Sequence, residues 1–210
     1  MTEANTSIAI AGAGSIGCYV GGCLALAGRS VRFLGRPSIT GALAAGGLRV
    51  SDLDGLDETL APAQLSATAD PAAALPGAGV ILVTVKSGQT AEIAETISRD
   101  APPGAVVVSL QNGTRNVATL RQRLGDRFVV VPGMVPFNVL QSQDARGDLH
   151  VHRATSGTIL IGNNGPAHLK ALLDVPHARV ARHADMEAVQ WGKLLLNLNN
   201  ALNALSGMPL

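Results

Sequence analysis

A glycine-rich turn near the start of the chain constrains the fold more than any other feature. The segment "GAGSIG" at residues 12–17 has the spacing G-x-G-x-x-G, follows an apolar run at 7–11 and opens a helical stretch that stops at Gly28. In such a strand–turn–helix unit the glycines permit a tight turn, close approach of a pyrophosphate, and close packing of helix on strand. The helix N-terminus adds oriented N–H groups. A purely structural turn has the same spacing, but the setting favours dinucleotide binding by Gly12, Ala13, Gly14, Ser15, Ile16 and Gly17.

Short apolar runs alternate with helical stretches through most of the chain. Further runs that are typical of strands lie at 30–35, 79–85, 105–110 and 127–131. Helical stretches at about 89–99 and 114–124 separate the last three of them. The run at 79–85 is rich in β-branched residues, as expected for a strand buried on both faces. Strands joined by helices of this length predict right-handed crossovers and a parallel sheet.

Turn signals predict two antiparallel hairpins beside these units. Asp54-Gly55 lies between alternating apolar residues within 47–68 and indicates the first hairpin. The strands 148–154 and 157–162, with Thr155-Ser156-Gly157 between them, predict a second hairpin that closes one sheet edge. A short helix at 166–174, a strand near 178–182 and a longer helix from about 184 complete the chain.

The predicted fold class is therefore α/β, with a Rossmann-type, doubly wound, mostly parallel sheet over residues 1–183. A longer helix follows this sheet from about residue 184.

Composition argues against nucleic-acid and membrane partners. Charged residues make up 15%, aromatic residues 2%, and the net charge is +1 without a basic block, which argues against nucleic acid. The N-terminus has no apolar signal-peptide core and no apolar run reaches the length of a membrane span, so we expect a soluble, cytoplasmic protein with no membrane partner. The two cysteines read as small buried hydrophobes. The five histidines lack carboxylates at ligand spacing, so no metal site is predicted.

The end of the second predicted strand indicates which dinucleotide binds. An NAD site usually has Asp or Glu there, which accepts hydrogen bonds from the ribose hydroxyls. Here the strand ends in Gly35-Arg36, and no acid occurs between Gly28 and Asp52. An arginine pairs with a 2′-phosphate through a bidentate fork, whereas an acid repels it. Arg36 therefore favours NADPH/NADP, the alternative being an ordinary surface arginine.

Polar residues end the next two predicted strands. Lys86 follows the run 79–85, and Asn112 follows the run 105–110. Each has a simple structural explanation, as a strand terminator and as part of an Asn-Gly turn. Because ligands of an open α/β sheet lie beyond the carboxyl ends of its strands, their shared edge favours function. We expect Lys86 to bind cofactor phosphate or ribose, and Asn112 to bind the nicotinamide ribose or substrate.

The helix near the C-terminus, "WGKLLLNLNNALNALSG", carries a polar stripe among leucines. Lys193, Asn197 and Asn200 share one face, with Gln190 one turn earlier. The leucines cover much of the remaining surface, so the helix is predicted to be mostly buried. The stripe either bonds neighbouring elements, with Lys193 reaching water, or faces a cofactor cleft. In the second case Lys193 is an acid for a carbonyl reduction, which generates an alkoxide that needs a proton.

Together, these motifs resemble those of the 2-dehydropantoate 2-reductase (ketopantoate reductase) family. The resemblance rests on "GAGSIG", the arginine after the second strand, "VK" and "NG" at the ends of buried strands, and "WGKLLLN". It implies NADPH-dependent reduction of 2-dehydropantoate to (R)-pantoate, on the route to pantothenate and coenzyme A. By motif, Gly12, Gly14 and Gly17 would bind the pyrophosphate, Arg36 and Lys86 the adenosine-phosphate side, and Asn112 nicotinamide and substrate. Lys193 would donate the proton and Asn197 would bind substrate.

The sequence departs from the family pattern in two ways. The family commonly has a second substrate asparagine where Ala201 stands here, and Asn200 is the nearest replacement. Family members are also longer and have an all-helical C-terminal domain for substrate binding and dimerisation. The resemblance therefore implies that residues 184–210 are the truncated start of that domain, and we expect its exposed leucines to promote homo-oligomers. The alternatives are an NADPH-dependent reductase of another small oxo acid, and a catalytically inactive NADP(H)-binding fragment.

Overall fold

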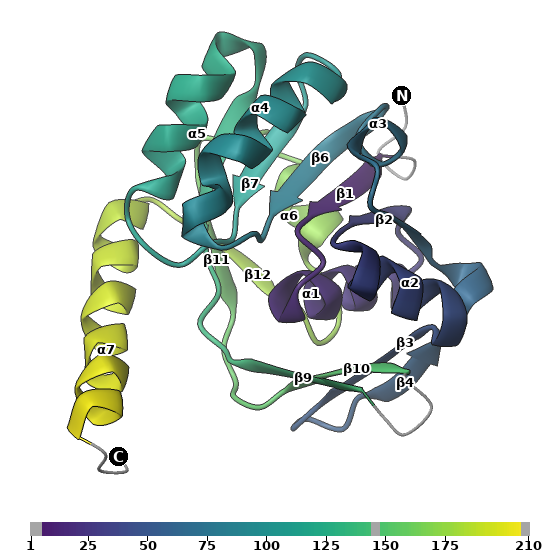
Figure 1. Cartoon of the computed structure of the whole chain (residues 1–210). Helices are drawn as coiled ribbons and strands as arrows, with labels where there is room; N and C mark the ends of the chain where they lie inside the picture. Colours follow the sequence, from purple (N-terminus) through teal and green to yellow (C-terminus); the bar gives the residue numbers. More distant parts are fainter. Residues whose placement is uncertain (1–5, 144–147, 207–210) are drawn as a thin grey trace.

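A computed structural model of the chain describes residues 6–143 and 148–206, giving only the backbone of residues 199–205. The main sheet has eight strands in the order β12-β11-β8-β7-β6-β1-β2-β5. Figure 1 shows this sheet running through the molecule between helical layers. Its strands are β1 (Ser7–Ala11), β2 (Val31–Leu34), β5 (Ser66–Thr68), β6 (Ala78–Val83), β7 (Val106–Ser109), β8 (Val129–Met134), β11 (Ile159–Gly162) and β12 (Val180–His183).

The main sheet is mostly parallel and doubly wound, as predicted. Strands β5, β2, β1, β6, β7 and β8 run parallel, whereas β11 is antiparallel to β8 and parallel to β12. The chain leaves β1 toward β2 on one side and resumes with β6 on the other. The order therefore reverses at β1, and in this fold ligands bind beside such a switch point.

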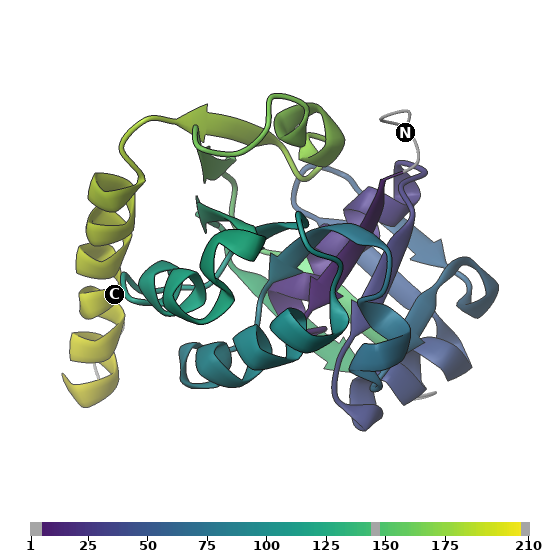
Figure 2. The ribbon, with the colours of Figure 1, turned by 90° about the horizontal axis from the view of Figure 1, so that it is seen from above.

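Alternating side chains of the strands supply two hydrophobic cores. Ile8 and Ile10 of β1 pack into one core, and Ala9 and Ala11 of the same strand pack into the other. The first core contains buried side chains of the helices α1 (Ser15–Leu26), α2 (Pro37–Gly46) and α6 (Leu169–Leu173). The second contains those of α3 (Pro71–Ala74), α4 (Thr90–Asp100) and α5 (Asn116–Leu124). Figure 2 shows α4 and α5 together on one side of the sheet.

A second sheet of four strands covers α1 on the side away from the main sheet (Figure 1). Its order is β4-β3-β10-β9. The strands are β3 (Leu48–Asp52), β4 (Asp57–Leu60), β9 (Val139–Gln143) and β10 (Leu149–Arg153). The first predicted hairpin is confirmed, because β3 and β4 pair antiparallel around Gly55, whose φ of 100° suits glycine.

The second predicted hairpin is wrong. β10 pairs with β3 in parallel and with β9 antiparallel, whereas β11 pairs with β8 in the main sheet. The segment Thr155-Ser156-Gly157 therefore joins two different sheets. Local turn chemistry could not reveal this, because the pairing of β10 with β3 depends on α1 lying between the two sheets.

A buried ion pair holds the second sheet against α1. The guanidinium of Arg153, whose side chain is 4% exposed, donates to the fully buried carboxylate of Asp52 at 2.9 Å and to Asp54. Its Nε donates to the Tyr19 hydroxyl at 2.8 Å. His177 Nδ1 lies 2.8 Å from the Asp52 carboxylate, and the His177 carbonyl accepts from Tyr19 at 2.9 Å. These bonds connect α1, β3, β10 and the turn before β12.

Hydrogen bonding overcomes the effect of burial on the ionisation of Asp52. Burial alone would raise its pKa, but bonds from Arg153, the Leu56 and Asp54 N–H groups and His177 lower the pKa well below its usual range. The carboxylate therefore stays ionised inside the protein. The two cysteines are buried as expected, and burial raises the pKa of the Cys18 and Cys23 thiols to about 12.

The last helix, α7 (Met186–Ser206), stands to one side of the main sheet (Figures 1 and 2). It packs against β8 and β11. The polar and apolar pattern predicted a mostly buried helix, which is wrong, because Leu195 is 63% exposed, Leu196 67% and Leu198 51%. These values agree instead with the exposed leucines expected for a truncated helical domain. The sequence shows which residues are apolar but not whether a surface covers them. The predicted domain boundary, between residues 183 and 184, falls between β12 and α7. Within the described residues, no helix is long and apolar enough to cross a membrane.

Candidate functional site

A cavity of about 360 Å³ lies at the carboxyl ends of β1, β2 and β6. This volume falls in the range of small-molecule sites. Its walls come from the turn after β1, the start of α2, the loop after β6 and one face of α4. The lining residues are Gly12, Ala13, Gly14, Leu34, Gly35, Arg36, Pro71, Thr84, Val85, Lys86, Gln89, Glu92, Ile93 and Thr96.

The three glycines of the turn differ in the space around them. A Cβ on Gly12, which has a φ of 117°, would lie 2.6 Å from the Val85 nitrogen. A Cβ on Gly17 would lie 2.3 Å from the Gly12 carbonyl oxygen. By contrast, a Cβ on Gly14 would have no neighbour within 4 Å. Gly12 and Gly17 are therefore required by the protein's own packing, whereas the space beside Gly14 is open.

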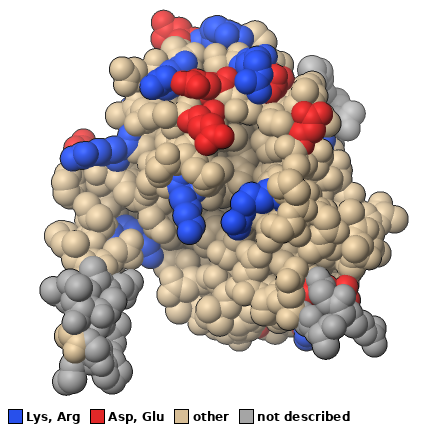
Figure 3. Space-filling model, viewed as in Figure 1, with Lys and Arg blue, Asp and Glu red and all other residues tan. Residues whose placement is uncertain are grey.

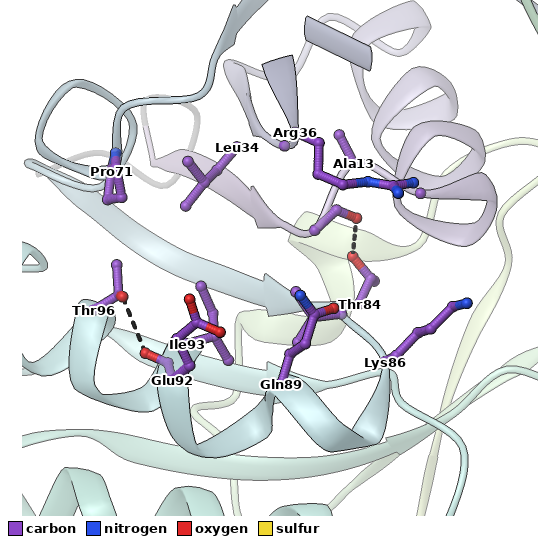
Figure 4. Close-up of a pocket in the computed structure, with 14 residues that line it drawn as sticks. Ala13, Leu34, Arg36, Pro71, Thr84, Lys86, Gln89, Glu92, Ile93 and Thr96 are labelled. Atoms are coloured by element: carbon purple, nitrogen blue, oxygen red, sulfur yellow. Dashed lines mark hydrogen bonds between the residues drawn. The ribbon is translucent and has the colours of Figure 1, made fainter. Parts of the chain in front are cut away.

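Thr84 fixes the turn against the end of β6. Its hydroxyl donates to the Gly12 carbonyl at 2.6 Å, a bond drawn in Figure 4. Gly14 then takes an extended conformation as the N-cap of α1, with φ −90° and ψ −168°. The first N–H groups of α1 begin at the cavity, which suits an anion because a helix N-terminus carries partial positive charge.

We expect the variants Gly14→Ala and Gly17→Ala to separate binding from folding. Gly14→Ala should lower the free energy of unfolding by at most about 1 kcal/mol, the cost of a poorer N-cap. It should weaken dinucleotide binding about tenfold or more, equivalent to about 1.4 kcal/mol, because the methyl group fills the open space. Gly17→Ala should instead destabilise the fold by about 2 kcal/mol or more through backbone overlap. Thermal unfolding and a cofactor titration would show the contrast; a Gly14→Ala chain that binds normally would contradict it.

Two cations flank the cavity on opposite walls. Arg36 precedes α2 and Lys86 ends the loop after β6, and both side chains are exposed. Figure 4 shows them extending toward the same side of the cavity. Figure 3 shows the molecule from the same side as Figure 1, with basic side chains near the centre of the face. The two cations suit an anionic ligand, in keeping with the adenosine-phosphate side to which the family resemblance assigned both residues.

The opposite end of the cavity is more apolar. Leu34, Pro71 and Ile93 lie there together with Glu92 and Thr96 (Figure 4). Apolar surfaces of this kind suit an aromatic base. The sequence analysis missed these residues, and it also missed Thr84 and Gln89. The helical spacing of Glu92, Ile93 and Thr96, which puts them on one face of α4, was a signal for three of these residues, and Gln89 is the N-cap of the same helix.

Asn112 does not line the cavity. It lies in the loop after β7, next to the loop that carries Lys86, and its side chain is exposed. Its backbone carbonyl accepts hydrogen bonds from the Ser87 hydroxyl at 2.9 Å and from the Asn116 amide at 2.7 Å. The two strand ends are thus close in space, while the Asn112 side chain remains available to a ligand.

The polar stripe of α7 faces the main sheet. Gln190 donates to the Gly133 carbonyl at 3.4 Å, and the Lys193 ammonium donates to the Pro136 carbonyl at 3.3 Å. Both acceptors lie at or beyond the end of β8, and β8 runs parallel to β7. Lys193 is therefore at the same sheet edge as Asn112, although it does not line the cavity. Asn197 is partly buried on the same helix face, and the Asn200 side chain lies outside the described residues.

The histidines form no cluster suited to a metal. Within the described ranges, no group of three or more His, Cys, Asp or Glu side chains is arranged to hold one. His150 and His152 both contact the Ser51 hydroxyl, at 2.7 and 2.8 Å, on the second sheet. This sheet lies beyond α1, away from the cavity.

Comparison with known proteins agrees with this geometry. Residues 8–166 match the family described as ketopantoate reductase PanE/ApbA. The chain belongs to this family. Its members are oxidoreductases that act on small keto acids with a dinucleotide cofactor.

Individual relatives are similar over nearly the whole chain. A 2-dehydropantoate 2-reductase of Halobacterium salinarum is 30% identical over 208 residues, which are 95% of this chain and 65% of the relative. The crystal structure of a PanE/ApbA family ketopantoate reductase from Ralstonia eutropha superposes with a TM-score of 0.83 at 34% identity, covering 97% of this chain and 65% of the other. A 2-dehydropantoate 2-reductase from Geobacter metallireducens gives 0.80 at 29%, covering 97% and 66%. The chain thus spans about two thirds of each relative.

Proposed function

We propose that the chain binds NADPH and that the protein reduces 2-dehydropantoate to (R)-pantoate. The observation that carries this proposal is the cavity at the switch point of the sheet, lined by the glycine-rich turn, Arg36 and Lys86, in a chain of the ketopantoate reductase family. Within this cavity, the turn residues 12–17 would hold the pyrophosphate against the N-terminus of α1. The apolar end at Leu34, Pro71 and Ile93 would take the adenine.

The preference for NADPH over NADH rests on charge. Arg36 and Lys86 approach the cavity from two sides, and β2 ends in Gly35 without an acid. Glu92 is the one carboxylate among the described lining residues, and Figure 4 shows it at the apolar end, away from Arg36. A 2′-phosphate would therefore meet two cations, which supports NADPH.

The remaining residues would serve the carbonyl of the substrate. The bound dinucleotide supplies the hydride, and the oxygen of the reduced carbonyl then needs a proton. Lys193 would donate it from its ammonium group, because α7 brings this lysine to the edge of the sheet beyond β7 and β8. Asn112 would hold nicotinamide or substrate, Asn197 would hold the substrate, and Asn200 would serve beside it.

A second candidate function is dinucleotide binding without turnover. Asn112, Lys193 and Asn197 do not line the cavity, and the apolar face of α7 is exposed in the part of the chain described. The described residues therefore enclose the proposed cofactor more completely than the proposed substrate. For the same reason, reduction of a different small oxo acid remains the alternative within the same reaction class.

Cofactor titration and a turnover assay test these proposals. We expect NADPH to bind at least about tenfold more tightly than NADH, a difference of about 1.4 kcal/mol. The double variant Arg36→Ala, Lys86→Ala should remove most of this preference while leaving NADH binding nearly unchanged. Arg121→Ala, an exposed arginine of α5 outside the cavity, is the matched control. Tighter binding of NADH than NADPH by the parent chain would contradict the role of Arg36.

The turnover assay follows NADPH oxidation with 2-dehydropantoate and with other small 2-oxo and 3-oxo acids. Faster turnover with 2-dehydropantoate supports the proposed substrate. Tight NADPH binding without turnover of any oxo acid would instead support the binding function.

A further inference from the structure

The loops after β6 and β7 are joined by hydrogen bonds between exposed groups of the loops and buried polar side chains beneath them. The Ser87 hydroxyl, directly after Lys86, donates to the carbonyl of Asn112 at 2.9 Å. The side-chain amide of Asn116, at the start of α5, donates to the same carbonyl at 2.7 Å and to the Ser87 hydroxyl at 3.1 Å. One amide group thus links the residue after Lys86 to Asn112 itself.

A second layer of hydrogen bonds supports this link. The Thr90 hydroxyl lies 2.8 Å from the Ser87 carbonyl and 3.0 Å from the Asn116 side-chain oxygen, and either can accept its proton. It accepts in turn from the Gln111 amide at 2.8 Å, which also donates to the Val85 carbonyl at 3.0 Å. Thr90 is 2% exposed, and Gln111 and Asn116 are each 5% exposed.

These buried polar residues lie at one end of α4 and α5, whereas the other buried residues of the two helices are apolar. Thr90 and Asn116 are buried in the first turns of α4 and α5, at the ligand edge of the sheet. The buried residues that follow are apolar: Ile93, Ala94 and Ile97 in α4, and Val117, Leu120 and Leu124 in α5. Within α4 and α5, polar side chains are therefore buried only in the first turns, where the two loops meet. Fully satisfied buried networks give rigidity and a unique geometry.

We propose that Asn116 and Thr90 are positioning residues, which hold Lys86 and Asn112 at a fixed separation along the bound dinucleotide. The inference rests on the proposed function, in which Lys86 meets the phosphate side of NADPH and Asn112 the nicotinamide side. Because the Asn116 amide contacts both loops, Lys86 and Asn112 would contact the two ends of the cofactor from one rigid pair of loops.

A double-mutant cycle on NADPH affinity tests this role. In the parent chain, Asn116→Ala should raise the Kd for NADPH about tenfold, within the usual range of coupling between residues in one network. In a background that carries Lys86→Ala and Asn112→Ala, Asn116→Ala should raise the Kd less than about twofold, because the two side chains that Asn116 is proposed to position are absent. Asn164→Ala is the matched control, since that amide donates at 2.9 Å to the Val130 carbonyl and does not line the cavity.

A second pair of variants covers the case in which Asn116→Ala does not fold. Thr90→Val keeps the shape of the side chain and loses the hydroxyl, whereas Thr90→Ser keeps the hydroxyl. We expect Thr90→Val to weaken NADPH binding and Thr90→Ser to restore it, with thermal unfolding used to confirm that each chain is folded. If Asn116→Ala raised the Kd for NADPH equally in the parent and in the background lacking both side chains, the positioning role would be overturned and the proposed NADPH binding would stand. A parent chain that binds no NADPH would refute the proposed function, and the inference with it.

Discussion

Replacing Lys193 with alanine is expected to lower kcat for 2-dehydropantoate reduction by about 10²–10⁴-fold, the usual contribution of a general acid. The reason is the alkoxide that hydride addition leaves on the substrate, which would have no proton donor at this edge of the sheet. The Kd for NADPH should change little, because Lys193 does not line the cavity and bonds the Pro136 carbonyl instead. Steady-state kinetics and a cofactor titration on the same preparations provide both values.

Lys170→Ala is a suitable control for this variant. Lys170 lies on α6, is exposed and pairs with Asp174 at 3.2 Å, so its loss should leave kcat unchanged. An active parent enzyme with an unaltered kcat in Lys193→Ala would exclude the lysine as the acid. A parallel loss of NADPH affinity would indicate that α7 supports the cofactor site rather than the chemistry.

The features that sequence could predict are those set by short-range patterns. The β-branched apolar run of β6 indicates a strand buried on both faces, and the glycine spacing after β1 indicates a turn. Lys86 and Asn112 were predicted to lie at one edge because the carboxyl ends of parallel strands meet there, and the loops that carry them are joined by the bond from Ser87 to the Asn112 carbonyl. This prediction needed only the direction of the strands and not their register.

The features that sequence missed depend on contacts between distant segments. β10 lies beside β3 because α1 fills the space between the two sheets, and no local signal reports that pairing. Asn116 looks like an ordinary first-turn residue until the loop with Ser87 folds against it. Similarly, the leucines of α7 have an apolar pattern whether or not a surface covers them.

Breaking the buried pair of Arg153 and Asp52 is expected to cause the largest loss of stability. Arg153→Met should lower the free energy of unfolding by about 3 kcal/mol or more, since removing one partner leaves the other charge buried. The Tyr19 hydroxyl would also lose its bond from Arg153 Nε. Urea unfolding at neutral pH measures the loss. Arg123→Met breaks an exposed pair with Glu95 and should cost less than about 1 kcal/mol.

The pH dependence of stability distinguishes this ion pair from simple packing. The folded-state pKa of Asp52 is depressed, so its contribution is complete above the ordinary Asp pKa of about 3.9 and is lost as the pH falls below it. Arg153→Met removes the first of the hydrogen bonds that lower this pKa, so less stability remains to be lost in acid. The difference in unfolding free energy between parent and variant should therefore narrow below about pH 4. The guanidinium carbon of Arg153 also lies 5.9 Å from the ring centre of Tyr19 and 5.7 Å from that of Phe137. If the difference in unfolding free energy stayed constant from neutral pH to pH 3, Arg153 would stabilise the protein through these ring contacts rather than through its charge.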